Sequence, residues 1–267
     1  MGYFEAMRKF DVIVPCGGTI DDEFARVVNT RTKALVKFED VTILTTTIAA
    51  LRKSPHVDRI VVIGPESVGD TDAAKKADEF LIEGKTGPEN IFRGLDWLLK
   101  TPNPPTEVMI VTGDLPFLTA ESINKFVALC PQGKDICIPL ISKEEFQDLY
   151  PRAEATFVGL RDGTWTTGCA YLATASGLQT AVHHINLVFK NRKSKLGMAR
   201  LLGLGFVFKY LTKSLSVQDV EGKAKHLLGI EGVAVRGVPP ELAYDIDDLD
   251  DYHYALSNLG AHRRETA

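Results

Sequence analysis

Asp114 is the residue in this chain that most strongly suggests chemistry. Residues 108–111 before it are all apolar and are bounded by glycine and proline, which is typical of a strand buried on both faces of a parallel sheet. Such a strand delivers the Asp114 carboxylate to the carboxyl edge of the sheet, where open α/β folds bind their ligands. A carboxylate at that edge can bind a cation. It can equally shape the turn before a helix expected at residues 120–129, and the isolated residue leaves both interpretations open.

Two consecutive glycines, Gly17 and Gly18, follow the first apolar run of the chain. Glycines at the end of a strand permit unusual backbone angles and leave N–H groups bare, so they can bind phosphate or the edge of a base. Their surroundings do not match the GxGxxG dinucleotide fingerprint. A Gly-Gly pair by itself is most often only a turn, so this segment needs support from elsewhere.

Five aspartates surround the start of a helix that we expect from Leu249. Helix capping and the helix dipole favour acidic residues there without any metal. Capping therefore accounts for some of these aspartates, and they cannot all be metal ligands. The five are Asp245, Asp247, Asp248, Asp250 and Asp251.

Apolar runs alternate with helical patterns from Asp11 to Leu140. This alternation predicts right-handed βαβ crossovers and a mostly parallel sheet with helices on both faces, and hence an α/β fold. The expected strands are residues 12–14, 59–63, 80–82, 108–111 and 136–140, and the expected helices are residues 43–52, 89–99 and 120–129.

The pattern changes after Leu140. We expect two antiparallel strands joined by a turn, then a helical region, then two short strands before the terminal helix. Ser216 starts a capping box for the last helix of the helical region. Together these features predict a single domain at residues 8–258, with a helical insertion at residues 177–228 and a flexible tail at residues 259–267. The expected strands are residues 156–160, 167–173, 233–236 and 242–244.

The composition is that of an ordinary soluble globular protein. Of the 267 residues, 45% are hydrophobic and 25% are charged, which is enough for one sizeable core. The net charge of −4 gives no reason to expect nucleic acid as a partner. No apolar run has the length of a membrane span, no zinc-type spacing links the four cysteines or His183-His184, and no signal-peptide pattern is visible. We therefore expect a cytoplasmic protein, and its oligomeric state stays open.

The helical insertion combines basic and apolar residues and has three interpretations. We favour packing against the sheet with a solvated basic rim, because this is the most frequent role of such a stripe. Contact with an anionic acceptor is the leading functional alternative, and contact with an anionic membrane surface ranks below it. The basic residues are Lys190, Arg192, Lys193, Lys195, Lys209 and Lys213, and the apolar ones include Leu201, Leu202, Phe206, Phe208, Tyr210 and Leu211.

In their order along the chain, these segments resemble the nucleotidyltransferase family, which includes molybdenum-cofactor guanylyltransferases, methylerythritol-phosphate cytidylyltransferases and sugar-phosphate nucleotidyltransferases. The resemblance covers nearly the whole chain and implies a Rossmann-like fold of the nucleotide-diphospho-sugar transferase type. The loop after Gly18 lacks the family's usual arginine and Met-Gly pair. In this respect the chain resembles a less characterised branch of the family. The matching segments are Gly17-Gly18, Lys33-Ala34-Leu35-Val36, residues 59–63, Gly87-Pro88-Glu89-Asn90, Gly113-Asp114-Leu115-Pro116-Phe117 and residues 245–251.

The resemblance also implies roles for individual residues. Lys33 contacts the nucleotide phosphates, and Asp114 and Asp247 bind Mg²⁺ together, so these three are the expected catalytic residues. Arg26 is the candidate to replace the missing arginine. Contacts with the acceptor fall to Thr167 and Gly168. The remaining nucleotide-binding positions are Pro15, Cys16, Gly17, Gly18, Thr19, Gly87, Asn90 and Gly113.

The predicted activity is Mg²⁺-dependent transfer of a nucleotidyl group from an NTP to a phosphorylated or otherwise anionic small acceptor, with release of pyrophosphate. A glycosyltransferase that uses a nucleotide sugar is the rival enzyme. That class usually carries a mid-chain Asp-x-Asp motif, where this chain has only Asp114. A non-catalytic nucleotide-binding domain is the other alternative. Neither the base nor the acceptor is specified by the sequence.

Overall fold

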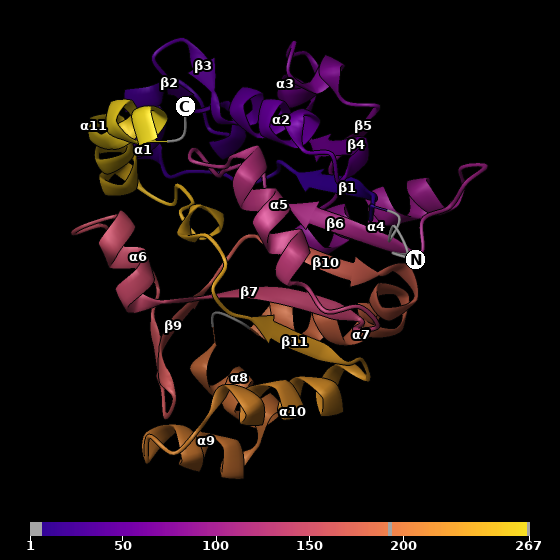
Figure 1. Ribbon diagram of the computed structural model, residues 1–267, viewed down its shortest axis with the longest axis vertical. Helices are drawn as coiled ribbons and strands as arrows, with labels where there is room; N and C mark the ends of the chain where they lie inside the picture. Colours follow the sequence, from indigo (N-terminus) through magenta and orange to yellow (C-terminus); the bar gives the residue numbers. More distant parts are fainter. Residues whose placement is uncertain (1–6, 192–193, 266–267) are drawn as a thin grey trace, which may run out of the picture.

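The computed structural model describes residues 7–191 and 194–265, and a nine-stranded sheet lies at its centre (Figure 1). Its strands are β1 (Phe10–Pro15), β4 (Val57–Gly64), β5 (Glu79–Ile82), β6 (Glu107–Val111), β7 (Ile136–Ser142), β8 (Val158–Leu160), β9 (Gly163–Thr167), β10 (Ala170–Thr174) and β11 (Gly232–Val235). They lie in the order β5-β4-β1-β6-β10-β7-β9-β8, and β11 also pairs with β7. A separate two-stranded sheet is formed by β2 (Lys37–Phe38) and β3 (Val41–Thr42).

Helices connect most of these strands. The α-helices are α1 (Asp22–Val28), α2 (Ile43–Lys53), α3 (Glu66–Gly69), α4 (Gly87–Leu99), α5 (Ala120–Leu129), α6 (Lys143–Leu149), α7 (Ala175–Asn191), α8 (Lys195–Leu202), α9 (Leu204–Leu211), α10 (Val217–Leu228) and α11 (Leu249–Glu265). The short 3-10 helices are η1 (Lys33–Leu35), η2 (Ala74–Lys76) and η3 (Pro240–Leu242).

The first half of the sheet is parallel. Strand β1 pairs in parallel with β4 and β6, and β4 pairs in parallel with β5. Strand β10 then lies antiparallel between β6 and β7, while β11 runs parallel to β7. The predicted α/β class is confirmed, and its Rossmann-like half has the parallel pairing that strand-helix alternation requires.

Alternating side chains of the central strands face opposite layers. Val12 and Val14 of β1 lie in the larger apolar core, together with residues of α2 and α5. Ile13, between them, lies in a second core with Leu95 and Leu98 of α4. Because successive side chains in a strand point to opposite faces, this arrangement requires helices on both faces, as predicted.

The predicted pair of strands after Leu140 is instead three strands. Strands β8 and β9 form a hairpin with a turn shorter than expected, because Leu160 already pairs with Gly163. The extended segment is interrupted at Gly168, between β9 and β10, where the Gly168 N–H donates to the Pro139 carbonyl. A Cβ atom there would lie 2.9 Å from the carbonyl oxygen of Leu242. This close approach ends β9 and lets β10 pair with β6.

One further expectation near the C-terminus needs correction. Residues 242–244 do not form a strand, because Pro239 and Pro240 remove backbone donors and the chain turns into η3. Helix α11 extends to Glu265, so residues 259–265 of the predicted tail are helical.

The helical insertion is confirmed as α7, α8, α9 and α10. Helix α7 packs on the sheet through Ala175 and Leu178, whereas the apolar stripe of α9 does not. Helix α9 is almost entirely apolar, yet none of its residues is buried. Arg192 and Lys193, part of the expected basic segment, lie outside the described residues. In the described part of the chain, no helix has both the length and the apolar character needed to cross a membrane.

Candidate active site

Lys33, Asp114 and Asp247 come together although they are far apart in the sequence. The Lys33 ammonium pairs with Oδ1 of Asp247, and its Nζ lies 3.8 Å from Oδ2 of Asp114. The Lys33 and Asp114 side chains are only 13% and 17% exposed, whereas Asp247 is 71% exposed. The cluster is therefore buried on one side and open to solvent on the other, as a binding site must be.

Backbone hydrogen bonds hold the segments that carry these side chains. The N–H of Gly113, at the end of β6, donates to the Pro15 carbonyl at the end of β1 (3.2 Å). The N–H of Ile246 donates to the Asp114 carbonyl (3.3 Å). The glycine loop, Asp114 and the segment around Asp247 thus form one unit at the carboxyl edge of the parallel sheet.

Lys33 is positioned by the glycine loop. Its N–H donates to the Gly18 carbonyl (2.9 Å), next to a bridge between Thr19 and Thr32. A Cβ atom at Gly18 would lie 3.2 Å from Cδ of Lys33. Because Gly18 has no side chain, the aliphatic part of Lys33 can lie directly against the loop, with its ammonium at the two carboxylates.

Burial and charge shape the protonation of the cluster. Burial raises the pKa of Asp114, and the Lys33 ammonium opposes this increase. Burial lowers the pKa of Lys33, but Asp114 and Asp247 outweigh it, so the net shift is upward. Lys33 is thus held as a cation, and it partly compensates a carboxylate that lies away from water.

Asp245 is a further member of the cluster that the sequence did not single out. Burial, followed by the charges of Asp114 and Asp247, raises the pKa of Asp245 to about 7. The sequence signal is the pattern Asp245-Ile246-Asp247, in which Ile246 is fully buried and the aspartates flank it. An apolar residue anchored between two acids indicates that both carboxylates lie at the edge of the core.

The donor set fits Mg²⁺. Oδ1 of Asp114 is buried and has no hydrogen-bond partner among the described residues. Carboxylate oxygens are the ligands that Mg²⁺ prefers, and one or two of them suffice when substrate phosphates complete the shell. Across residues 7–191 and 194–265, no three His, Cys, Asp or Glu side chains form a metal site by themselves. The protein would therefore provide only part of the coordination.

Close packing under Asp114 depends on Gly113. A Cβ atom there would lie 2.5 Å from Sγ of Cys16, which is closer than real Cβ contacts allow. Burial raises the pKa of the Cys16 thiol, and Asp114 adds to the effect, so this cysteine is a neutral packing group. Cys16 and Gly113, both expected to contact the nucleotide, hold the two segments together.

We expect Gly113→Ala to destabilise the protein by about 1–3 kcal/mol, because the added methyl overpacks the contact with Cys16. In a Cys16→Ala background the nearest atoms to the new methyl are 3.4 and 3.5 Å away, so the cost should largely disappear. Denaturant unfolding of the four proteins in this double-mutant cycle measures the coupling. Gly159→Ala, where the structure has open space, is the matched control. An equal cost in both backgrounds would contradict this role of Gly113.

Glu83 and Asn90 border the other side of the glycine loop. A Cβ atom at Gly17 would lie 1.9 Å from Oε2 of Glu83 and 3.0 Å from Nδ2 of Asn90. Asn90 is buried, and its Oδ1 accepts from the N–H of Gly84 (2.6 Å). Gly87 begins α4 and so sets the position of Asn90 in its first turn. Glu83 was not predicted, because nothing in its sequence surroundings points to Gly17.

The remaining predicted residues lie in different places. Arg26 is exposed on α1 and donates to the Asp22 carbonyl within the same helix (3.1 Å), so its hydrogen bond does not reach the cluster. Thr167 is exposed at the end of β9, and Gly168 is buried beside Pro139. The N–H of Thr112, two residues before Asp114, donates to the carbonyl of the next residue, Cys169 (3.1 Å). After burial, the charges of Asp245 and Asp114 also raise the pKa of Cys169. The predicted acceptor loop is therefore adjacent to the cluster.

Comparisons with known proteins identify the family of this chain. The family model described as the MobA-like NTP transferase domain matches residues 25–192. A hypothetical transferase from Thermus thermophilus is 27% identical, with a TM-score of 0.80 over 91% of this chain and 99% of its own. No protein of the curated set compared with this chain matches it.

More distant structures share the fold. A nucleotidyl transfer enzyme from Methanothermobacter thermautotroptrophicus is 14% identical, with a TM-score of 0.57 over 95% of this chain and 98% of its own. A CMP:2-keto-3-deoxy-manno-octonic acid synthetase is 10% identical, with a TM-score of 0.56 over 95% of this chain and 99% of its own. Because the family model matches more than half of the residues, the chain belongs to the family of MobA-like NTP transferase domains.

Proposed function

We propose that this protein transfers a nucleotidyl group from an NTP to a phosphorylated or otherwise anionic small acceptor, with Mg²⁺ as cofactor and pyrophosphate as product. Family membership supports nucleotidyl transfer in general. The observation that carries the finer proposal is the Lys33 ammonium held between Asp114 and Asp247 beside a glycine loop. This arrangement has a cation for phosphates and two carboxylates for a metal ion within one site.

The glycine loop is the candidate site for the nucleotide phosphates. Among the described residues, neither the N–H of Gly17 nor that of Gly18 donates a hydrogen bond to the protein. Bare N–H groups at the end of a strand can bind anions. We place the base or ribose on the side of Glu83 and Asn90, which both contact the space around Gly17.

Asp114 and Asp247 would hold Mg²⁺, and Asp245 lies close enough to both that their charges raise its pKa. When bound, the ion would polarise the phosphoryl oxygens and offset the charge that develops on them. The Lys33 ammonium, already held as a cation, would balance the charge of the phosphates and of the leaving pyrophosphate. These are contributions of positioning and electrostatics, which dominate catalysis of phosphoryl and nucleotidyl transfer.

The reaction needs few proton transfers. An acceptor oxygen would form a bond to the α-phosphorus, and the bond from that phosphorus to the bridging oxygen would break. The electron pair of the broken bond leaves on pyrophosphate. A phosphate acceptor is already anionic, so no residue has to act as its base. We place this acceptor near Thr167 and Gly168, because the loop that they form lies next to the carboxylate cluster.

A thermal-shift screen against the four common NTPs with Mg²⁺ tests nucleotide binding. At one hundred times its Kd a ligand stabilises a protein by about 2.7 kcal/mol, which corresponds to roughly 5–10 °C in Tm for a domain of this size. We expect one NTP to give such a shift and its effect to fall when Mg²⁺ is removed. Shifts that do not depend on Mg²⁺ would argue against a metal at this site.

Pyrophosphate release with a panel of anionic acceptors then tests the chemistry. Release that depends on the acceptor supports nucleotidyl transfer. If the protein instead consumes a nucleotide sugar and transfers the sugar, it is a glycosyltransferase. Nucleotide binding without turnover for any acceptor would indicate a binding domain.

A further inference from the structure

Helix α9 exposes an apolar face. Leu204, Phe208 and Leu211 are 86%, 67% and 72% exposed. Their spacing of four and three residues places them on one side of the helix, and we call these three residues the α9 face. Soluble proteins seldom expose neighbouring large apolar side chains, so such a face indicates contact with another surface.

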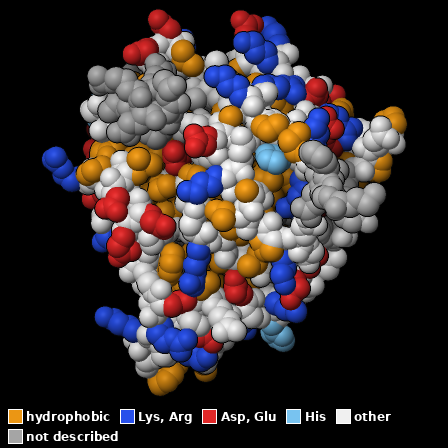
Figure 2. All heavy atoms as spheres, viewed as in Figure 1, with side chains coloured by type: hydrophobic (Ala, Val, Ile, Leu, Met, Phe, Trp, Pro, Cys, Tyr) orange, Lys and Arg blue, Asp and Glu red, His pale blue; other side chains and the backbone are white. Residues whose placement is uncertain are grey.

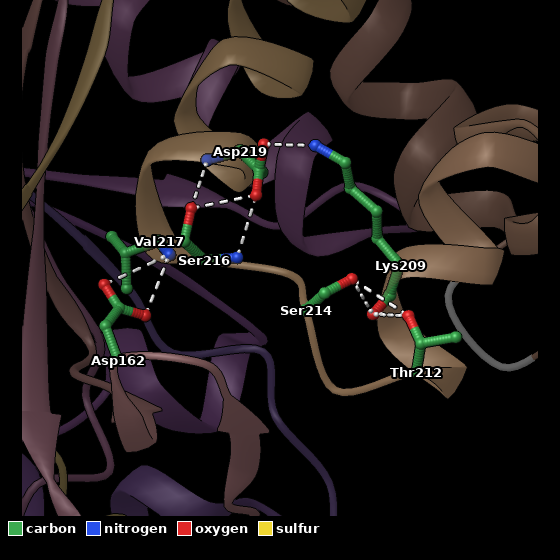
Figure 3. A network of polar contacts seen from close by, with 7 residues as sticks. All are labelled: Asp162, Lys209, Thr212, Ser214, Ser216, Val217 and Asp219. Atoms are coloured by element: carbon green, nitrogen blue, oxygen red, sulfur yellow. Dashed lines mark hydrogen bonds and ion pairs between the residues drawn. The ribbon is translucent and has the colours of Figure 1, made fainter.

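The orientation of α9 is fixed by polar contacts on its other side. Lys209 pairs with Asp219 of α10 (2.8 Å), and Asp219 also closes the capping box with Ser216 (Figure 3). Gly205, Phe206 and Lys209 line an open cavity of about 660 Å³ that α10 also borders. One side of α9 thus faces α10, and the α9 face points away from the protein.

The chain segment that carries this face is rich in basic residues. Between Asp162 and Asp219 the chain contains seven Lys or Arg residues and no Asp or Glu, although the whole protein has a net charge of −4. Lys190, Arg200 and Lys213 are exposed on or next to α7, α8 and α9. Figure 2 shows Lys and Arg side chains beside hydrophobic ones at the end of the molecule formed by these helices.

We propose that the α9 face docks on the surface of an anionic lipid bilayer. A helix that lies in the membrane interface needs an apolar face for the acyl boundary and basic residues for anionic headgroups. Helix α9 with its neighbours has both, and no described helix is suited to cross the bilayer. The exposed Lys190, Arg200 and Lys213 favour a negatively charged surface over a neutral apolar partner. This proposal does not depend on the proposed enzymatic function.

Vesicle flotation of the full-length protein tests the proposal. The wild type should float with vesicles that contain roughly one-third phosphatidylglycerol and should stay unbound with pure phosphatidylcholine. The variant Leu204→Gln/Phe208→Gln/Leu211→Gln should bind these vesicles at least about tenfold more weakly, because it no longer inserts apolar side chains into the bilayer. Its Tm should not change, since the replaced side chains are exposed. Val27→Gln/Leu129→Gln changes other exposed apolar residues and should float like the wild type.

Charge reversal supplies an independent arm. Lys190→Glu/Arg200→Glu/Lys213→Glu should lose flotation, whereas Lys37→Glu/Lys53→Glu, at exposed lysines elsewhere, should retain it. Absence of flotation with anionic vesicles, or equal flotation of the triple glutamine variant, would overturn the proposal. A third outcome would also overturn it: the wild type is a dimer in light scattering, and the triple glutamine variant is a monomer with unchanged lipid binding. A second copy of the chain would then cover the α9 face.

Discussion

Asp114→Asn is expected to lower kcat by about a thousandfold or more at saturating Mg²⁺, because loss of a metal ligand removes several kcal/mol of charge stabilisation in the transition state. The variant should fold normally. Burial already raises the pKa of Asp114, so a neutral amide of the same shape removes an unfavourable buried charge. Initial rates of pyrophosphate release as a function of Mg²⁺ concentration, together with denaturant unfolding, measure both effects.

The matched control is Asp250→Asn. It removes the same charge from the acidic segment, but Asp250 is exposed in the first turn of α11. We expect its turnover and its Mg²⁺ dependence to stay within about twofold of the wild type, since screened surface charges have little effect. Full activity of Asp114→Asn, or an equal loss in Asp250→Asn, would rule out Asp114 as the metal ligand.

The sequence predicts the position of Asp114 well because the signal is local. An apolar strand followed by Gly113 and Asp114 requires only neighbouring residues to be interpreted, and β6 ends where the pattern says. The pairing of Asp114 with Asp247 came from the resemblance to a family, not from the pattern. Periodicity describes one element at a time, so it cannot show that a hydrogen bond from Ile246 joins these two segments.

Two of the missed features depend on contacts between distant segments. Glu83 reaches Gly17 only because β5 and β1 lie in the same sheet on either side of β4. The strand predicted at residues 167–173 divides at Gly168 because Pro139 and Leu242 approach its backbone. No neighbour in the sequence reports such an approach.

Helix α9 illustrates a different limit. Its apolar residues correctly predict a helix, but the same pattern describes a face packed on a core and a face left open. The choice depends on where the rest of the chain lies. Here α10 and the Lys209–Asp219 ion pair take one side of α9 and leave the other exposed.

Lys33→Met is expected to weaken binding of the triphosphate by about 10- to 100-fold, because one charge-assisted contact with a phosphate contributes about 1.5–3 kcal/mol. Methionine keeps an apolar stem of similar length against Gly18 and removes only the ammonium. Calorimetric titration with the NTP identified by thermal shift measures the effect. Lys37→Met, at an exposed lysine four residues further on, should bind the NTP like the wild type.

Lys33 has a second role that this variant alone does not separate from the first. In the structure the Lys33 ammonium compensates the buried Asp114 carboxylate. Loss of Lys33 would therefore favour protonation of Asp114, and this alone would weaken nucleotide binding even if Lys33 did not contact the phosphates. Combining Lys33→Met with Asp114→Asn distinguishes the two roles, because the amide needs no compensating cation. If Lys33 contacts the phosphates, its removal should still weaken NTP binding about tenfold or more in the Asp114→Asn background. If the effect disappears there, Lys33 only neutralises Asp114, and the phosphate-binding cation must come from another residue.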